Sequence, residues 1–331
     1  MEKRCELSVL RRCLGVLPLL GLLAAVQAPG ALAQSYPVKT VRFVVPSSPG
    51  GSMDFSARMI ARGISAVWKQ QVIVENRPGA NFMIGTDYVA KSRPDGYVLL
   101  FSTLGGTALN PAVFDNLPYK ADDLIPVVQT SKNNVLLYVN NAVPAKTVAE
   151  FLALLRASPG KYNHASGGTS TFMLGHLFRS VGKVSFEDIN FKGGSLAFAS
   201  LAGGQTHFSF GDPNTAGAAV RAGKVRPLAA ATKVRSPLLP NMPTMIESGV
   251  PNFYFTSGVG VFAPAGTPMD IVRKINADVQ AVARSPELTK ILERTGSEVE
   301  TGSPEDFSRL VHSELDLWSR LVKERNIKVG G

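Results

Sequence analysis

Three loops rich in glycine, serine and threonine are the segments of this chain best suited to bind a small anion. They span residues 46–54, 165–171 and 192–195, and each is expected between a strand and a helix. Glycine lets a ligand approach the backbone, and the free N–H groups at a helix start carry partial positive charge. Hydroxyl groups add donors that rotate toward an acceptor. Such loops also serve as ordinary helix caps, but three of them in one chain favour a carboxylate site.

Two acidic residues, Asp54 and Asp212, each stand at an expected helix start. A carboxylate in that position commonly caps the first N–H groups of the helix. For Asp54 this role is favoured over contact with a ligand. Asp212 fits a cap equally well, and if it faces a cleft it could receive a ligand amine or hold a bridging water.

Motifs for catalysis or metal binding are missing from the sequence. No histidine stands in an H-E-x-x-H pattern, and neither G-x-S-x-G nor a Walker lysine motif occurs. Carboxylates do not cluster at metal-ligand spacing. His176 stands among apolar residues on an expected helix, which favours a structural role. We therefore expect no catalytic residue, no metal site and no cofactor.

Apolar, β-branched runs alternate with helical patterns over most of the chain. The expected strands are residues 41–45, 72–74, 98–101, 135–139, 208–210 and 228–231. Residues 55–67 carry apolar side chains at helical spacing, and Thr147 followed by Glu150 predicts a capped helix start. Helices are also expected to open at Thr267-Pro268 and Ser303-Pro304. This alternation predicts parallel sheets covered by helices.

The N-terminus has the three parts of a cleavable secretory signal. Basic residues occur between positions 3 and 12, an apolar run covers 14–26, and Ala31-Leu32-Ala33 forms an A-x-A site. The apolar run is shorter than the ~20 residues that span a bilayer. We expect cleavage after Ala33. Arg11-Arg12 leaves the general secretory and twin-arginine routes both open.

Removal of the signal changes the chemistry of the chain. Both cysteines, Cys5 and Cys13, lie within it, so the mature protein has no disulfide and no thiol. Four basic and two acidic residues leave with the signal, so the formal charge falls from +10 to +8 on 298 residues. A basic protein suits anions, but its cations are scattered and no basic-aromatic stripe appears. Small anions are therefore favoured, and no nucleic-acid partner is expected.

Twelve short motifs along the chain resemble one known family. They are residues 36–37, 44–46, 49–54, 74–80, 94–97, 110–111, 117–119, 166–171, 192–194, 201–205, 235–244 and 262–268. In this order they resemble the substrate-binding receptors of tripartite tricarboxylate transporters, called Bug receptors. The match covers essentially the whole mature chain, and Phe262-Ala-Pro-Ala-Gly-Thr-Pro268 is close to a signature.

The resemblance implies an α/β fold of the type II periplasmic binding protein class, a Venus flytrap with two lobes. Each lobe would have a mixed or parallel sheet flanked by helices, with the ligand cleft between the lobes. Residues 34–134 plus 259–331 would form lobe 1, and residues 135–258 would form lobe 2. Family members close on organic acids by hinge motion and deliver them to a membrane permease.

The resemblance also implies ligand contacts. In the family, the first loop and the loop of residues 166–171 grip one ligand carboxylate with the help of ordered waters. The implicated residues here are Ser47, Ser48, Gly51, Ser166, Thr169, Ser170 and Thr171. Around the remainder of the ligand we expect Phe82, Thr103, Gly194, Ser195 and Asp212, with Asp54 kept as a further candidate contact.

Three places depart from the family pattern. Ser47-Ser48 stand where an aromatic or aliphatic residue is usual, Asn81-Phe82-Met83 replace small residues, and Gly211 and Pro213 flank Asp212. Phe82, Met83 and Phe172 either form an apolar wall for the ligand or simply pack under their loops. The first alternative suggests an aromatic or apolar carboxylate in place of a polar tricarboxylate.

Together these features predict a monomeric receptor in a Gram-negative periplasm. It would capture a small organic carboxylate and deliver it to the permease subunits of a tripartite transporter. One alternative is a receptor that presents its ligand to a sensor kinase. A periplasmic enzyme acting on an acid is the least favoured alternative, because no base and nucleophile pair is found.

Overall fold

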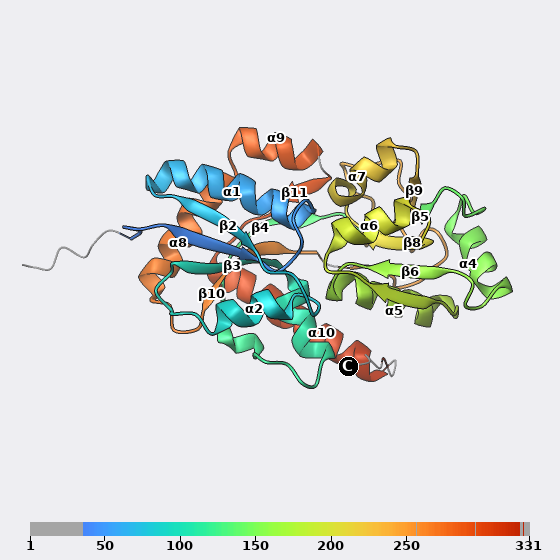
Figure 1. Ribbon diagram of the computed structural model, residues 1–331, viewed down its shortest axis with the longest axis horizontal. Coiled ribbons are helices and arrows are strands. Elements are labelled where there is room, and N and C mark those ends of the chain that lie inside the picture. Colours follow the sequence, from blue (N-terminus) through green and yellow to red (C-terminus); the bar gives the residue numbers. More distant parts are fainter. Residues whose placement is uncertain (1–35, 256, 295, 325–326, 328–331) are drawn as a thin grey trace, which may run out of the picture. The chain divides into compact units, whose positions relative to one another are not determined.

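The computed structural model describes residues 36–255, 257–294, 296–324 and 327. The expected signal peptide and its cleavage site at Ala33 lie outside the described residues. Within residues 39–331 the strands form two separate sheets, each covered by helices (Figure 1). One sheet has six strands and the other has five.

The six-stranded sheet takes its strands from two distant parts of the chain, in the order β11-β4-β10-β3-β1-β2. The strands are β1 (Val41–Val45), β2 (Val72–Asn76), β3 (Val98–Thr103), β4 (Leu124–Asn133), β10 (Val259–Pro264) and β11 (Ser297–Val299). β1 pairs in parallel with β2 and β3, whereas β10 runs antiparallel to β3 and β4. The sheet is therefore mixed, and its parallel part carries the first glycine-rich loop after β1.

Helices cover both faces of this sheet. They are α1 (Ser52–Trp68), α2 (Met83–Ala90), the π-helix η1 (Gly105–Leu109), α3 (Asn110–Val113), the 3-10 helix η2 (Ala121–Asp123), α8 (Met269–Ala283), α9 (Pro286–Arg294) and α10 (Pro304–Glu324). α1 packs on β1, β2 and α8. Helices α1 and α8 approach each other closely at Gly63 of α1, where a Cβ atom would lie 2.4 Å from the Val282 side chain of α8.

The five-stranded sheet has the order β7-β6-β8-β5-β9. Its strands are β5 (Leu136–Asn140), β6 (Asn163–Ser166), β7 (Glu187–Asn190), β8 (Phe208–Gly211) and β9 (Val225–Ala230). Its helices are α4 (Val148–Ala157), α5 (Thr169–Gly182), α6 (Gly194–Ala202) and α7 (Pro213–Arg221). Each of α5, α6 and α7 starts directly after a strand or its loop, so their N-termini gather at one edge of the sheet.

Strand β5 shows why this sheet is buried on both faces. Leu136 and Tyr138 belong to the cluster beneath α6 and α7, and the Tyr138 ring meets the edge of Phe198 at 5.2 Å. Leu137 and Val139 belong to the larger cluster on the opposite face. Because successive side chains of a strand point to opposite faces, a fully apolar strand must be covered twice.

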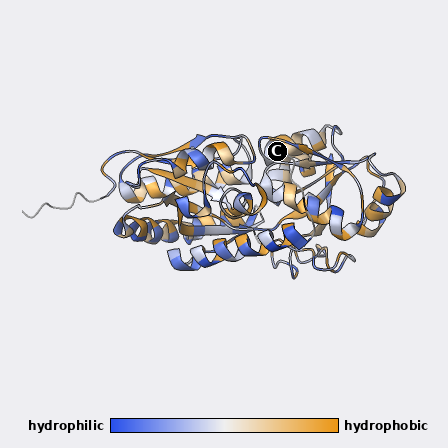
Figure 2. Ribbon diagram, turned by 90° about the horizontal axis from the view of Figure 1, so that it is seen from below, coloured by the Kyte–Doolittle hydropathy of each residue, from blue (hydrophilic) through white to orange (hydrophobic). Residues whose placement is uncertain are grey.

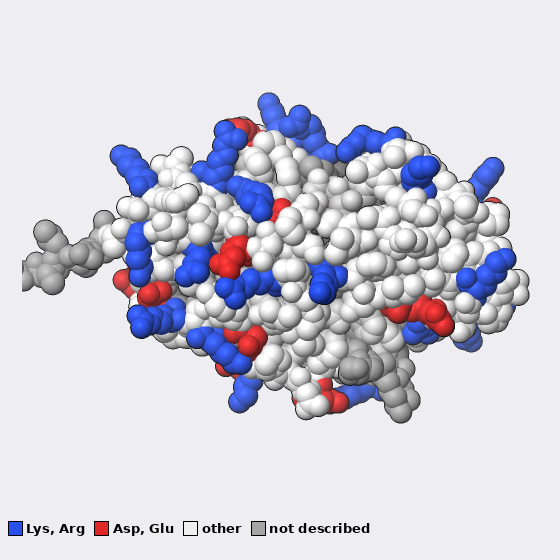
Figure 3. Space-filling view, in the orientation of Figure 1, with Lys and Arg blue, Asp and Glu red and all other residues white. Residues whose placement is uncertain are grey.

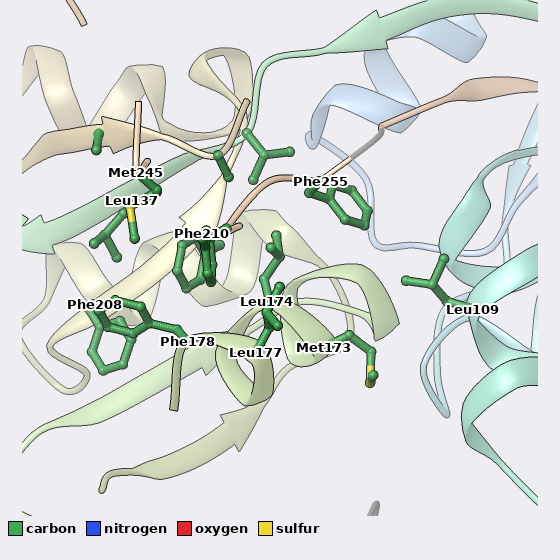
Figure 4. Close-up of a cluster of buried hydrophobic side chains, with 14 of the residues drawn as sticks. Leu109, Leu137, Met173, Leu174, Leu177, Phe178, Phe208, Phe210, Met245 and Phe255 are labelled. Carbon is green, nitrogen blue, oxygen red and sulfur yellow. The ribbon is translucent and has the colours of Figure 1, made fainter. Parts of the chain in front are cut away.

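Aromatic rings fill the larger cluster. The centroid of the Phe178 ring lies 6.1 Å from the ring centroid of Phe208, 5.8 Å from that of Phe210 and 5.9 Å from that of Phe253. Figure 4 shows Phe178, Phe208 and Phe210 of this group, and it also shows Met173 of α5 and Leu109 of η1, which belong to the same cluster. The same apolar cluster therefore continues from the five-stranded sheet to the helices of the six-stranded sheet.

The structure confirms all six expected strands, with small differences at their ends. It also adds β4, β6, β7, β10 and β11, which the apolar runs did not indicate. β4 contains Pro126, which cannot donate to a ladder. Pro126 lies outside the part of β4 that pairs with β11, which is residues 131–133.

Two of the expected helix starts are confirmed and one needs correction. The Thr147 hydroxyl accepts from the Glu150 N–H at 3.2 Å, and Ser303 and Asp306 cap each other reciprocally. Pro268, expected inside the helix, is instead the N-cap residue of α8, which begins at Met269. The side chain of Glu150 accepts from the Lys146 N–H at 2.7 Å, one residue earlier than in an ideal capping box.

Figure 2 shows hydrophilic and hydrophobic residues interleaved along several helices. In α1 the buried residues include Ala57, Ile60, Ala61 and Ile64, which recur at helical spacing. Among the described residues, no helix combines the length and hydropathy that crossing a membrane requires.

The aromatic cluster gives a stability prediction. Phe178→Ala should lower the free energy of unfolding by roughly 3–5 kcal/mol, because it leaves a cavity among fully buried rings. Leu196→Ala, on the exposed side of α6 with 46% of the side chain accessible, should change it by no more than about 0.5 kcal/mol. Urea unfolding followed by circular dichroism measures both values. Equal effects of the two substitutions would contradict the packing described.

Candidate functional site

A cavity of about 100 Å³ is enclosed by loops that follow strands of both sheets. Nine of the thirteen residues predicted to contact a ligand line it. They are Ser47, Ser48, Gly51, Phe82, Thr103, Ser170, Thr171, Gly194 and Asp212. All three glycine-rich loops therefore reach one cavity, although the first loop is more than 100 residues from the other two in the chain.

Ser166, Thr169 and Ser195 do not line the cavity. Ser166, fully buried, donates its hydroxyl to Asp188 at 2.6 Å. Thr169, also buried, donates to the side-chain oxygen of Asn110 and to a backbone carbonyl at residue 81. The Ser195 hydroxyl donates at 3.1 Å to the backbone carbonyl of residue 49. These three hydroxyl groups hold the loops in place, and any ligand contact by them stays a prediction.

Asp54 also lies outside the cavity, where it fixes the first loop. Its carboxylate accepts from the Gly50 N–H at 3.0 Å, from Arg58 at 2.9 Å and from the Asn76 amide at 3.0 Å. Asn76 in turn donates at 3.0 Å to the backbone carbonyl of Ser47. The expected capping role is wrong: the N-cap residue of α1 is Gly51, without a side-chain cap, and Asp54 binds the Gly50 N–H just before the helix.

The environment of Asp54 changes its acidity. Burial raises the pKa of the carboxyl group, but hydrogen bonds from Arg58, Gly50 and Asn76 together outweigh burial and lower the pKa below its ordinary value of 3.8. Asp54 is therefore ionised at neutral pH, and its bonds to the loop are charge-assisted.

The starts of α1, α5 and α6 face the cavity without side-chain caps. Their N-cap residues are Gly51, Gly168 and Gly193, and none has a side chain to occupy the first N–H groups. Gly168 and Gly193 have φ angles of 144° and 147°, which other residues rarely adopt. One first-turn donor, the Ser52 N–H, bonds to Thr215 at 3.1 Å. The other first-turn N–H groups have no partner within their helices, and uncapped helix starts of this kind can bind an anion.

The start of α7 is capped, by contrast, by Asp212. One carboxylate oxygen accepts from the Thr215 N–H at 3.0 Å. The other accepts from the Ser52 hydroxyl at 2.8 Å and the Thr215 hydroxyl at 3.0 Å. Asp212 thus lines the cavity and also ties the first loop of the six-stranded sheet to α7. Of the two roles left open from sequence, the helix cap is the one that these bonds show.

The Ser170 hydroxyl group differs from its neighbours. Its oxygen is buried and has no hydrogen-bond partner among the described residues. The neighbouring Thr171 hydroxyl accepts from Gly167 at 2.8 Å and donates to Gly168 at 3.0 Å, so it shapes its own loop. A buried polar atom without a partner is rare in folded proteins. A ligand or water in the cavity would satisfy it.

Much of the remaining wall is apolar, and sequence reasoning missed most of it. Outside the three loops, the cavity also contacts Leu104, Asn133, Val135, Phe198, Phe210, Gly211, Thr215, Phe255, Ser257 and Gly258. Phe82 lines the cavity and is only 7% exposed, so its position fits the alternative in which it forms an apolar wall for the ligand. Met83 does not line the cavity, and Phe172 packs on His176 at 4.4 Å instead.

Charge is nearly absent from the cavity. Among the described residues, no lysine, arginine or histidine lines it, and Asp212 is its one charged side chain. On the face shown in Figure 3, lysine and arginine side chains are scattered over the surface, several beside acidic residues. No cluster of three potential metal ligands occurs in the described part of the chain. An anion in the cavity would depend on N–H and hydroxyl donors.

Comparison with known proteins places this architecture in a family. The model of the tripartite tricarboxylate transporter family receptor matches residues 56–327. The chain belongs to this family of receptors. Among its relatives, Protein BugT of Bordetella pertussis is 30% identical over 322 residues, covering 96% of this chain and 98% of BugT. The family resemblance inferred from the short motifs is thereby confirmed.

Two solved structures show the same fold in this receptor family. An R. palustris protein with adipate is 32% identical, covers 88% of this chain and 99% of its own, and superposes with a TM-score of 0.85. MatC from Rhodopseudomonas palustris with bound malate is 31% identical, covers 87% of this chain and 100% of its own, and has a TM-score of 0.83. The expected fold of a two-lobed periplasmic binding protein is confirmed.

Asp54 gives a pH-dependent prediction. Asp54→Asn should lower the free energy of unfolding by about 1–3 kcal/mol at pH 7, because it removes charge-assisted hydrogen bonds. A carboxyl group with a lowered pKa stabilises the fold above its unfolded pKa, near 3.8, and loses this contribution as pH falls further. The difference between wild type and variant in urea unfolding should therefore shrink at pH 3. A difference of the same size at both pH values would contradict this role.

Proposed function

We propose that the protein is a periplasmic solute-binding receptor for a small organic carboxylate whose remainder is apolar. It would deliver this ligand to the permease subunits of a tripartite transporter. The observation that carries the proposal is the set of three glycine-capped helix starts around one cavity, next to the partnerless Ser170 hydroxyl. Export to the periplasm and cleavage after Ala33 are part of the proposal.

The carboxylate would be held without a cation. Backbone N–H groups at the starts of α1, α5 and α6 supply donors, and the helix dipoles add favourable potential. Ser170 adds a hydroxyl donor. Asp212 does not repel the ligand strongly in this scheme, because both of its oxygens are occupied by donors from Ser52 and Thr215. Ser47, Ser48, Gly51, Gly194 and Thr171 would shape the site around the ligand.

The rest of the ligand would lie against aromatic rings. Phe82, Phe198, Phe210 and Phe255 contribute to the wall, together with Met53 and Leu104. A second or third carboxylate placed against these side chains would lose its hydration without gaining donors, which is costly. An acid with one gripped carboxylate and an apolar or aromatic remainder avoids this cost. The acids present in the two related structures, adipate and malate, support the carboxylate class.

Hinge closure suits this arrangement. The chain passes between the two sheets at residues 133–135 and again before β10, and Phe255, Ser257 and Gly258 of the second passage contribute to the cavity wall with Asn133 and Val135. We propose that residues 34–134 and 259–331 form one lobe and residues 135–258 the other. The two lobes would close on the ligand as a monomer.

Transport is preferred over two other roles. A ligand-presenting receptor for a sensor kinase would use the same cavity, and genes for a large and a small membrane permease beside this gene would favour transport. An enzyme needs a base within reach of the ligand. Among the described residues no histidine lines the cavity, and the carboxylate of Asp212 is engaged as a cap.

Ligand class is tested by calorimetric titration of the purified mature protein. We expect binding of benzoate or a short aliphatic acid, with weaker binding of citrate, because citrate brings three carboxylates into an apolar cavity. Tight citrate binding without binding of an aromatic or aliphatic acid would contradict the proposed ligand class. Absence of binding to every acid would contradict the proposed function itself.

Ser170 gives a prediction on affinity. Ser170→Ala should weaken binding of the best acid by about tenfold, the effect of losing one hydrogen bond to a charged group. Ser313→Ala makes the same chemical change on the exposed surface of α10 and serves as the control. Calorimetry of both variants measures the effect. Unchanged affinity in Ser170→Ala would show that this hydroxyl does not contact the ligand.

A further inference from the structure

The turn of residues 80–82 has an unusual backbone. Ala80, Asn81 and Phe82 have φ angles of 44°, 49° and 72°, three left-handed residues in succession, none of them glycine. L-residues usually visit this region singly, because Cβ then crowds the following carbonyl oxygen. Such strain persists only where surrounding contacts hold it, and it concentrates at functional sites. The turn comes directly before α2 and projects Phe82 toward the cavity.

Asn81 supplies the contacts that hold this turn. Its backbone carbonyl accepts from Asn110 at 2.9 Å and from Thr169 at 3.1 Å. Its side-chain oxygen accepts from the Asn190 amide at 2.6 Å. Thr169 and Asn190 belong to elements of the five-stranded sheet, whereas Asn81 belongs to the six-stranded one. The turn is thus fixed from both sides of the cavity.

The Phe82 ring ends directly on Gly168. A Cβ atom at Gly168 would lie 2.2 Å from the tip of the ring, and one at Gly105 would lie 3.4 Å from its edge. Only glycine leaves room for the ring at position 168. The ring therefore seals against the backbone of the ligand-binding loop.

A second cavity lies on the other side of this seal. It has a volume of about 200 Å³ and is lined by Asn81, Asn190 and Lys192 among others. We call it the vestibule. Phe82 and Gly168 are the two residues that line both it and the ligand cavity. The vestibule differs chemically from the ligand cavity, because it is lined by amide groups and a lysine. Lys192 takes part in none of the ion pairs between described residues.

We propose that Phe82 is a partition that sets the length of the ligand. With the ring in place, the cavity ends at an aromatic wall and accepts a short acid with one gripped carboxylate. Without the ring, the cavity joins the vestibule, and the far carboxylate of a longer dicarboxylate reaches Lys192. This inference rests on the proposed function, since it assumes that one carboxylate is bound at the helix starts.

The substitution Phe82→Ala tests the partition. Alanine keeps the Cβ atom, so the backbone strain at position 82 is retained while the ring is removed. Calorimetry would compare dicarboxylates from glutarate to suberate with the corresponding monocarboxylates from pentanoate to octanoate. In the wild type, affinity should fall toward the long members of both series. In Phe82→Ala, the longest acids should gain roughly tenfold or more, the scale of discrimination that pocket size sets.

A double variant tests the role of Lys192. In Phe82→Ala/Lys192→Gln, the long monocarboxylates should keep their gain, whereas the added advantage of the dicarboxylates should disappear. Phe172→Ala is the matched control, because Phe172 packs on His176 outside the cavity. It should leave the dependence on chain length unchanged. Persistence of the dicarboxylate advantage in the double variant would overturn the role of Lys192.

The remaining outcomes are also decisive. If the wild type binds short acids and Phe82→Ala keeps the same dependence on chain length, the partition is wrong while the proposed function stands. If the wild type binds neither benzoate nor any acid of either series, the proposed function fails and the partition fails with it. If Phe82→Ala does not fold, as thermal melting would show, Phe82→Leu decides in its place: a partial shift toward longer acids is expected, and no shift overturns the partition.

Discussion

A carboxylate can be buried only where donors replace the water that it loses, and this constraint organises the molecule. Burying an isolated charge is costly, and the described cavity wall contains no cation to offset it. Helix starts are the remaining source of donors, because their first N–H groups have no partner within the helix. Glycine at the N-cap of α1, α5 and α6 leaves those donors uncovered. The two sheets, in turn, bring these helix starts together.

Hydrogen bonds across the cavity connect the loops of the six-stranded sheet to the loops of the five-stranded sheet. Ser48 donates its hydroxyl at 2.7 Å and its N–H at 3.2 Å to the carbonyl of Lys192. Ser52 donates to Asp212, and Ser195 donates to the carbonyl of Pro49. These bonds join the loop after β1 to the starts of α6 and α7. Of the two serines that distinguish the first loop, Ser48 therefore has a structural role as well: it joins the loops on the two sides of the cavity.

Much of the site could be predicted from residue chemistry, because Gly/Ser/Thr loops after strands are recognisable from a short stretch of sequence. Ser47, Ser48, Gly51, Ser170 and Thr171 were found this way or through the family pattern, and all line the cavity. Their individual roles were harder to predict. Whether a hydroxyl faces the ligand or its own loop depends on side-chain direction, which the sequence does not contain. Ser166 and Thr169 face inward to Asp188 and Asn110 for this reason.

The apolar wall was missed for a different reason. Phe198 and Phe210 have the pattern of ordinary core residues, and each packs in a core cluster as well as touching the cavity. Asn133 and Ser257 lie where the chain passes between the sheets, and only the fold brings those passages together. Strand β4 was not predicted, because Pro126 and the polar C-terminal half of the strand interrupt the apolar pattern. Long-range assembly, which single-sequence patterns do not encode, accounts for all of these cases.

The most direct measurement of the central claim is a crystal structure of the mature protein with a bound acid. It should place one ligand carboxylate within hydrogen-bond distance of the N–H groups at the starts of α1 and α5 and of the Ser170 hydroxyl. No lysine or arginine should contact that carboxylate. A ligand whose carboxylate is paired with a cation elsewhere, or a ligand that presents an amine to these helix starts, would contradict the account.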